Sequence, residues 1–168
     1  MAVSLISTGL SGDILNATQC AFNVKLDPQA NVTGDNTTFP ANTDDASNIG
    51  TTETYDQGGD VSGALFTAPV TGRYALYYFV TIQGVNTESY ANMQFVTSNN
   101  SYLFYHSYDS YNMFAVGSAN PGWIAAISGE IICDMDASDT AFISHAFYSI
   151  SKVVDIVDNS FFTGHLVC

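Results

Sequence analysis

Residues 63–80 read GALFTAPVTGRYALYYFV. A short apolar segment ends at Pro69, and a long apolar and aromatic segment begins after Gly72. Proline has no backbone N–H, so Pro69 suits a turn better than the interior of a sheet. Glycine adopts backbone angles that other residues resist, which suits Gly72 to a corner. The stretch therefore predicts two β-strands that meet at a fixed corner.

Short apolar or alternating segments lie on both sides of this corner, with turn residues between them. No segment of useful length combines a helical period with helix caps. We expect an all-β sandwich or jelly roll, with most of residues 29–60 in a long loop. The strands expected outside the corner are at residues 20–26, near 39, and at 51–55, 73–83, 91–97, 102–107, 123–135, 140–149 and 160–167.

The composition favours one folded domain. The chain has 168 residues, of which 46% are hydrophobic, 13% aromatic and only 11% charged. So much apolar material can form a packed core, and it would leave large apolar patches on a monomer, which favours an oligomer. Residues 1–18 show no clear periodicity. We expect them to form an N-terminal arm or attachment segment, and residues 19–168 to form the domain.

The charge balance excludes some partners. Three Lys and Arg residues stand against 16 Asp and Glu residues, for a formal net charge of −13. Proteins that bind nucleic acid or anionic membranes use clustered Lys and Arg, which this chain lacks. No apolar run approaches the roughly 20 residues that span a bilayer. The first residues also lack the basic start and long apolar centre of a secretory signal, so we expect no export by that route.

The sequence contains no recognisable enzyme motif. The phosphate-loop, dinucleotide, nucleophile-elbow and zinc-protease patterns are all missing. His106, His145 and His165 are far apart, within expected strands, and suit packed or surface positions better than a catalytic role. The three cysteines, Cys20, Cys133 and Cys168, have no metal-binding spacing. They are either three buried reduced thiols or one pair with a free third. We expect a protein that is not an enzyme and has no cofactor.

Two groups of residues are candidates for binding. Asp134, Asp136 and Asp139 lie at one expected turn, and carboxylates in loops are ligands that calcium prefers. The turn lacks the glycine and the distal glutamate of a calcium loop, so a solvated acidic turn is the alternative. Tyr108 and Tyr111 follow an aromatic strand, and exposed tyrosines beside Ser and Asn are typical of recognition surfaces.

The chain resembles the globular head of complement component 1q, a relative of the tumour necrosis factor fold. The resemblance rests on the corner, with its Gly63, FTAP at 66–69 and GRY at 72–74, on AFNV at 21–24, and on SFFTGHL at 160–166. One extra residue lies between Gly63 and Phe66, and no collagen-type repeat precedes the domain. The resemblance implies a homotrimer of jelly rolls with about ten strands each, packed by aromatic residues. Those that could supply inner faces are Tyr77, Phe79, Phe95, Phe104, Phe147 and Phe161.

These observations lead to two hypotheses about function. In the first, the chain is a non-enzymatic structural protein of a virus particle, most simply a bacteriophage. It would be a trimeric capsid decoration protein, fibre head or knob on the virion surface. Residues 1–18 would attach it to other virion proteins, and it could also bind a host surface glycan or protein. In the alternative, the chain is a secreted, extracellular recognition module of the same fold that binds glycans or proteins.

Overall fold

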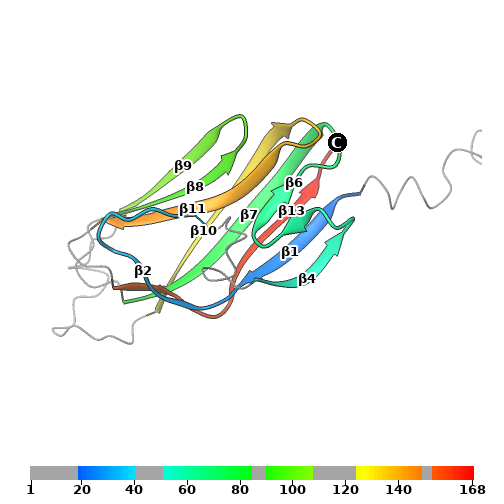
Figure 1. Ribbon diagram of the computed structural model, residues 1–168. Coiled ribbons are helices and arrows are strands. Elements are labelled where there is room, and N and C mark those ends of the chain that lie inside the picture. The colour runs from blue at the N-terminus through cyan, green and yellow to red at the C-terminus, as the bar shows by residue number, and fades with distance from the viewer. Residues whose placement is uncertain (1–18, 41–50, 85–89, 108–123, 149–152) are drawn as a thin grey trace, which may run out of the picture.

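The computed structural model describes residues 19–40, 51–84, 90–107, 124–148 and 153–168. The strands form two sheets that pack as a sandwich (Figure 1). All of the paired strands are antiparallel. In the described parts of the chain there is no helix long and apolar enough to span a membrane. The predicted all-β sandwich is confirmed.

The first sheet, which we call sheet A, has seven strands. Its centre is β7, which pairs with β10 on one side and with β13 and β12 on the other. The strands of sheet A are β1 (Ala21–Leu26), β2 (Gln29–Thr33), β4 (Thr51–Gln57), β7 (Gly72–Gln83), β10 (Ile124–Met135), β12 (Val154–Ile156) and β13 (Ser160–Leu166).

The second sheet, sheet B, has six strands, with β11 and β8 at its centre. Its strands are β3 (Phe39–Pro40), β5 (Val61–Ser62), β6 (Leu65–Thr67), β8 (Tyr90–Thr97), β9 (Ser101–Ser107) and β11 (Thr140–Tyr148). The predicted corner is therefore the place where the chain leaves sheet B after β6 and enters sheet A at β7. A Cβ atom at Gly72 would lie 2.7 Å from the carbonyl oxygen of Cys168, so this corner position suits glycine.

The described residues hold thirteen strands, against about ten predicted. The additional ones have two to five residues. β2 was wrongly expected to be part of a loop, because its sequence QANVT is short and largely polar, and it lies in a stretch rich in Asn, Thr, Asp and Gly. β12 has only three residues, too few to show a period.

The core lies between the two sheets and is rich in aromatic rings. Phe22 of β1 stacks on Phe66 of β6 with ring centroids 4.7 Å apart, and it meets Phe162 of β13 at 5.0 Å. Along β7, every second side chain from Tyr74 to Ile82 is fully buried. This alternation is that of a strand with one face on a core.

Replacing Tyr78 by phenylalanine is expected to raise the free energy of unfolding by about 1 kcal/mol, because its fully buried hydroxyl has no hydrogen-bond partner among the described residues. Tyr74→Phe is the matched control on the same strand. The hydroxyl of Tyr74 donates to the carbonyl of Val70 at 2.7 Å, so its loss is expected to destabilise by a similar amount. Urea denaturation of both variants checks the pair. Equal destabilisation by both substitutions would contradict the prediction.

Candidate functional site

The face of sheet A that points away from the core carries three half-buried aromatic side chains, Tyr77, Phe79 and Phe161. Successive side chains of a strand point to opposite faces, so the residues on either side of buried Tyr78 point outward. Phe161 lies opposite Phe79 in the register of β13 and β7. Their rings stack with centroids 5.6 Å apart, and Tyr77 lies 5.7 Å from Phe161. The three rings form one aromatic patch.

Further apolar side chains on the same face extend this patch. Ile124 and Ile132 of β10 are 60% and 62% exposed, and Tyr55 of β4 is 50% exposed. Ile132 pairs with Ala75 of β7, and Tyr55 pairs with Asn23 of β1. We call the surface formed by Tyr55, Tyr77, Phe79, Ile124, Ile132 and Phe161 the aromatic face. Apolar surface of this kind usually marks an interaction site.

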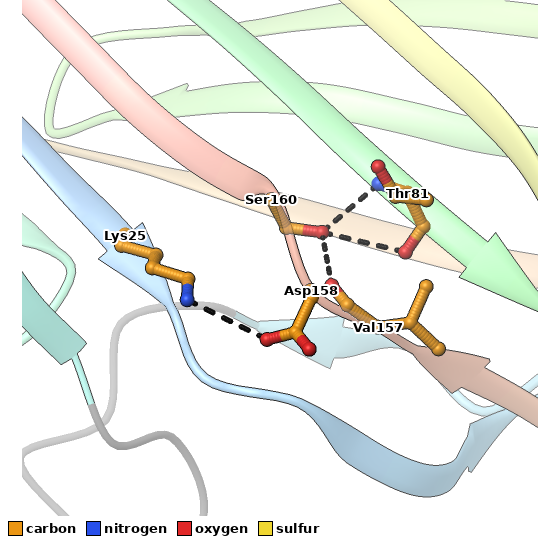
Figure 2. Close-up of polar contacts among 5 residues, drawn as sticks. All are labelled: Lys25, Thr81, Val157, Asp158 and Ser160. Carbon is orange, nitrogen blue, oxygen red and sulfur yellow. Dashed lines mark hydrogen bonds and ion pairs between the residues drawn. The ribbon is translucent and has the colours of Figure 1, made fainter.

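Both basic side chains that the structure describes, Lys25 and Arg73, lie on this side of sheet A and are paired with carboxylates. Figure 2 shows Lys25 paired with Asp158. Lys25 Nζ lies 3.5 Å from Asp158 Oδ1, and Arg73 Nε lies 3.1 Å from Asp134 Oδ1. Exposed ion pairs such as these add little stability. Their effect is local charge balance, which reduces the repulsion that two copies of so acidic a chain would feel across this face.

Ser160 fixes the start of β13, next to Phe161. Its buried Oγ accepts a hydrogen bond from the N–H of Thr81 at 2.9 Å and lies 2.9 Å from the carbonyl oxygen of Val157 (Figure 2). These contacts hold β13 against β7, so Phe161 projects from a rigid part of the sheet.

A hollow of about 190 Å³ lies beside Tyr77 on this face. Glu130 of β10, Thr163 and His165 of β13 contribute to its lining. It is smaller than the roughly 300–1,000 Å³ of a drug-sized ligand site. The hollow can receive a single side chain, which fits a protein contact better than a small-molecule site.

The acidic turn predicted to bind calcium has a different arrangement. The Asp139 carboxylate accepts hydrogen bonds from Ser98 Oγ at 3.0 Å, from Asn99 Nδ2, and from the N–H of Asp136 at 2.8 Å. Asp139 thus joins the β10–β11 turn to the β8–β9 turn. This structural role already uses three of the about four lone-pair sites of the carboxylate.

The other two acids of the turn also have protein partners. Asp134 pairs with Arg73, and Asp136 Oδ1 lies 3.4 Å from Thr71 Oγ1. In the described ranges, no three residues among His, Cys, Asp and Glu are grouped so that they could hold a metal ion. Calcium at Asp134, Asp136 and Asp139 stays a prediction, and these hydrogen bonds argue against it.

All three cysteines are free thiols. Cys20 and Cys133 are buried, as expected, but Cys168 is exposed, so the expectation of three buried thiols is wrong for the last residue. Burial raises the pKa of the Cys20 thiol to about 12 and that of Cys133 to about 11. Both thiols therefore stay protonated and unreactive at neutral pH.

The histidines lie as expected where they are described: His145 is buried and His165 is exposed. The His106 side chain, Tyr108, Tyr111 and residues 1–18 lie outside the described residues. On β9, the neighbouring aromatic side chains alternate as a strand requires. Tyr102 and Phe104 pack against the core, whereas Tyr105 is 69% exposed.

The six aromatic residues expected to supply inner faces divide into two groups. Phe95 and Phe147 are core residues and Phe104 packs against the core, whereas Tyr77, Phe79 and Phe161 form the aromatic patch. The isoleucines and Tyr55 were missed. One signal could have found Ile132: it follows Ile131 directly, and two successive apolar residues in one strand must point to opposite faces.

No protein-family model and no curated protein matches the chain. Solved structures do match. The globular domain of zebrafish complement 1qA is 15% identical, with 89% of this chain and 98% of that chain covered and a TM-score of 0.56. Murine APRIL at pH 8.5 is 11% identical, with coverage of 89% and 99% and a TM-score of 0.54. Murine APRIL at pH 8.0 is 10% identical, with coverage of 88% and 98% and a TM-score of 0.55. The likeness confirms the jelly-roll fold of the complement 1q and tumour necrosis factor type.

Proposed function

We propose that this chain is a non-enzymatic recognition and structural module that assembles as a homotrimer through the aromatic face. The observation that carries the proposal is that sheet A has apolar side chains on both of its faces. One face covers the core, and the other presents the stacked rings of Phe79 and Phe161 beside exposed Ile132. A second apolar face on a sheet needs a partner of its own.

A second copy of this chain is the partner that the charges favour. The chain carries a net charge of −13, so two copies repel one another over most of their surfaces. Lys25 and Arg73 are both on the outer side of sheet A, where they offset the charges of Asp158 and Asp134, so that Glu130 opposite Tyr77 is the carboxylate nearest the aromatic patch. The resemblance to the complement 1q head implies a trimer rather than a dimer.

We place the trimer on the surface of a virus particle, as a decoration protein, fibre head or knob, with residues 1–18 as the attachment segment. Support for the attachment role is the sequence of residues 1–18, which is small and mixed and has no strand period. The second candidate is an extracellular recognition module that binds glycans or proteins, and the match to the zebrafish complement 1qA domain favours it. Cosedimentation with particles supports the first placement, and binding on a glycan array supports the second.

The first experiment is light scattering of the purified full chain. We expect a mass three times the 18.0 kDa of one chain, both for the full chain and for a variant that lacks residues 1–18. A trimer in both would leave residues 1–18 free for attachment. A monomeric full chain would overturn the proposed assembly, and a trimer that needs residues 1–18 would move the interface away from the aromatic face.

A further inference from the structure

One segment of the chain crosses from sheet A to sheet B. β2 belongs to sheet A, where it pairs with β12, and β3 belongs to sheet B, where it pairs with β11. We call residues 33–40, which join the two sheets, the crossing segment. Figure 1 shows the chain passing from β2 towards β11.

Few contacts hold the crossing segment on β11. Thr33 Oγ1 donates to the carbonyl of Thr37 at 2.6 Å and accepts from the N–H of Phe147 at 3.0 Å. The N–H of Asn36 donates to the carbonyl of Phe147 at 3.1 Å. β3 pairs with β11 at two positions, whereas β8 pairs with it at eight. Asn36 also has a left-handed backbone with φ of 71°. Gly34 and Asp35 also form isolated bridges with Tyr148. The crossing segment is thus held on β11 by short pairings, as β6 is, and not by a long ladder such as that of β8.

His145 lies on β11 beside the end of this segment, paired with Phe39. In the register of sheet B it stands between Phe39 of β3 and Met93 of β8, and its ring lies 5.0 Å from that of Phe39. The side chain is 1% exposed, and neither ring nitrogen has a hydrogen-bond partner in the part of the chain that the structure describes. A buried polar group without a partner is costly, and a buried charge without one is far more costly.

Among the residues that the structure describes, the strands paired with β11 carry no ionised side chain that would compensate such a charge. The titratable residues on β8 and β11 are Tyr90 and Tyr148, and β2 and β3 carry none. Asp35 of the crossing segment is exposed, and its carboxylate accepts a hydrogen bond from the N–H of Thr37 at 3.2 Å. On sheet A, the buried phenol of Tyr78 packs on Phe95 of β8, and burial raises its pKa, so it is neutral as well. Burial therefore lowers the pKa of His145 to about 3 in the folded protein.

We propose that the crossing segment is an acid-sensitive gate over His145: protonation of the imidazole releases residues 33–40 from β11, while the rest of the sandwich stays folded. The direction follows from proton linkage. The open state exposes an imidazole of ordinary pKa near 6.5, so it binds more protons than the closed state as the pH falls. Between pH 7.5 and pH 5.0 the open population rises by about 30-fold.

Hydrogen exchange of the full chain, followed by mass spectrometry and corrected for the intrinsic rate at each pH, tests this gate. We expect protection of the Asn36 and Phe147 amides to fall by about 30-fold between pH 7.5 and pH 5.0, with β7 and β13 unchanged. His145→Phe removes the titrating group and is expected to abolish the change. His165→Phe, at the exposed histidine, is the matched control and is expected to keep it.

Three results would overturn the gate: unchanged protection at pH 5.0, an equal loss of protection in His145→Phe, or a loss spread evenly over β7 and β13. If His145→Phe does not fold, exchange of the histidine C2 hydrogens in the unmodified protein replaces it. That measurement gives the pKa of His145 directly, and a value of 6.5 or above would contradict the proposal. None of these outcomes depends on the oligomeric state.

Discussion

Replacing Phe22 by alanine is expected to lower the free energy of unfolding by about 3–5 kcal/mol. The side chain is fully buried and touches both sheets, since its ring stacks on Phe66 of sheet B and meets Phe162 of sheet A. It also fits closely against Gly164, where an added Cβ would lie 2.8 Å from the Phe22 ring. Alanine would leave a cavity where the two sheets are joined. Urea denaturation at one fixed protein concentration measures the change.

Leu103→Ala is the control for this prediction. Leu103 of β9 is 43% exposed, so its truncation removes less buried area and creates no enclosed cavity. We expect a loss of no more than about 1 kcal/mol. Similar losses for Phe22→Ala and Leu103→Ala would mean that the contact between Phe22 and Phe66 does not hold the two sheets together.

The strands that the sequence predicted best are those in which buried apolar side chains recur at every second position. β7 alternates between core and surface from Leu76 to Val80 and β13 does so from Ser160 to His165, and the Pro69–Gly72 corner marks the start of β7. β2 could not be predicted, because its pairing with β12 joins residues more than 120 positions apart. Nothing local in QANVT indicates that partner, and Asn31 even has a left-handed backbone with φ of 55°.

The candidate site depends on register, which the sequence does not state. The run Tyr77–Tyr78–Phe79 shows that both faces of one strand are aromatic, but it does not say which ring points to the core. Pairing with β13 decides this, because it brings Phe161 opposite Phe79. The calcium prediction had the same weakness. Ser98 and Asn99, whose side chains bind Asp139, are about 40 residues away from it along the chain.

His145 shows a further limit of sequence reasoning. A histidine inside an apolar strand was expected to be packed or exposed, and it is packed. What the sequence could not show is that both ring nitrogens lack a partner, because Phe39 and Met93 are its neighbours through two separate strand pairings. The acid-sensitive gate follows from those pairings and not from the local pattern.

Replacing Phe79 by aspartate is expected to convert the proposed trimer into a monomer. Phe79 lies at the centre of the aromatic face, half-buried against Phe161 and opposite Ser128 of β10. A carboxylate there would be buried without a partner when two copies meet, which costs about 3–5 kcal/mol at each interface and weakens each contact by about 100-fold or more. Light scattering at micromolar concentration measures the mass, and circular dichroism shows whether the sheet signal is kept.

Val96→Asp is the matched control for the aromatic face. Val96 is also half-buried and also points away from the core, but it lies on β8 of sheet B, one residue before the end of that strand. The substitution adds the same charge to the opposite side of the sandwich, so we expect the trimer to persist. Dissociation by Val96→Asp and not by Phe79→Asp would place the contact on sheet B. Dissociation by both would show that net charge, rather than the aromatic face, controls assembly, because each variant adds one negative charge to a chain that already carries −13.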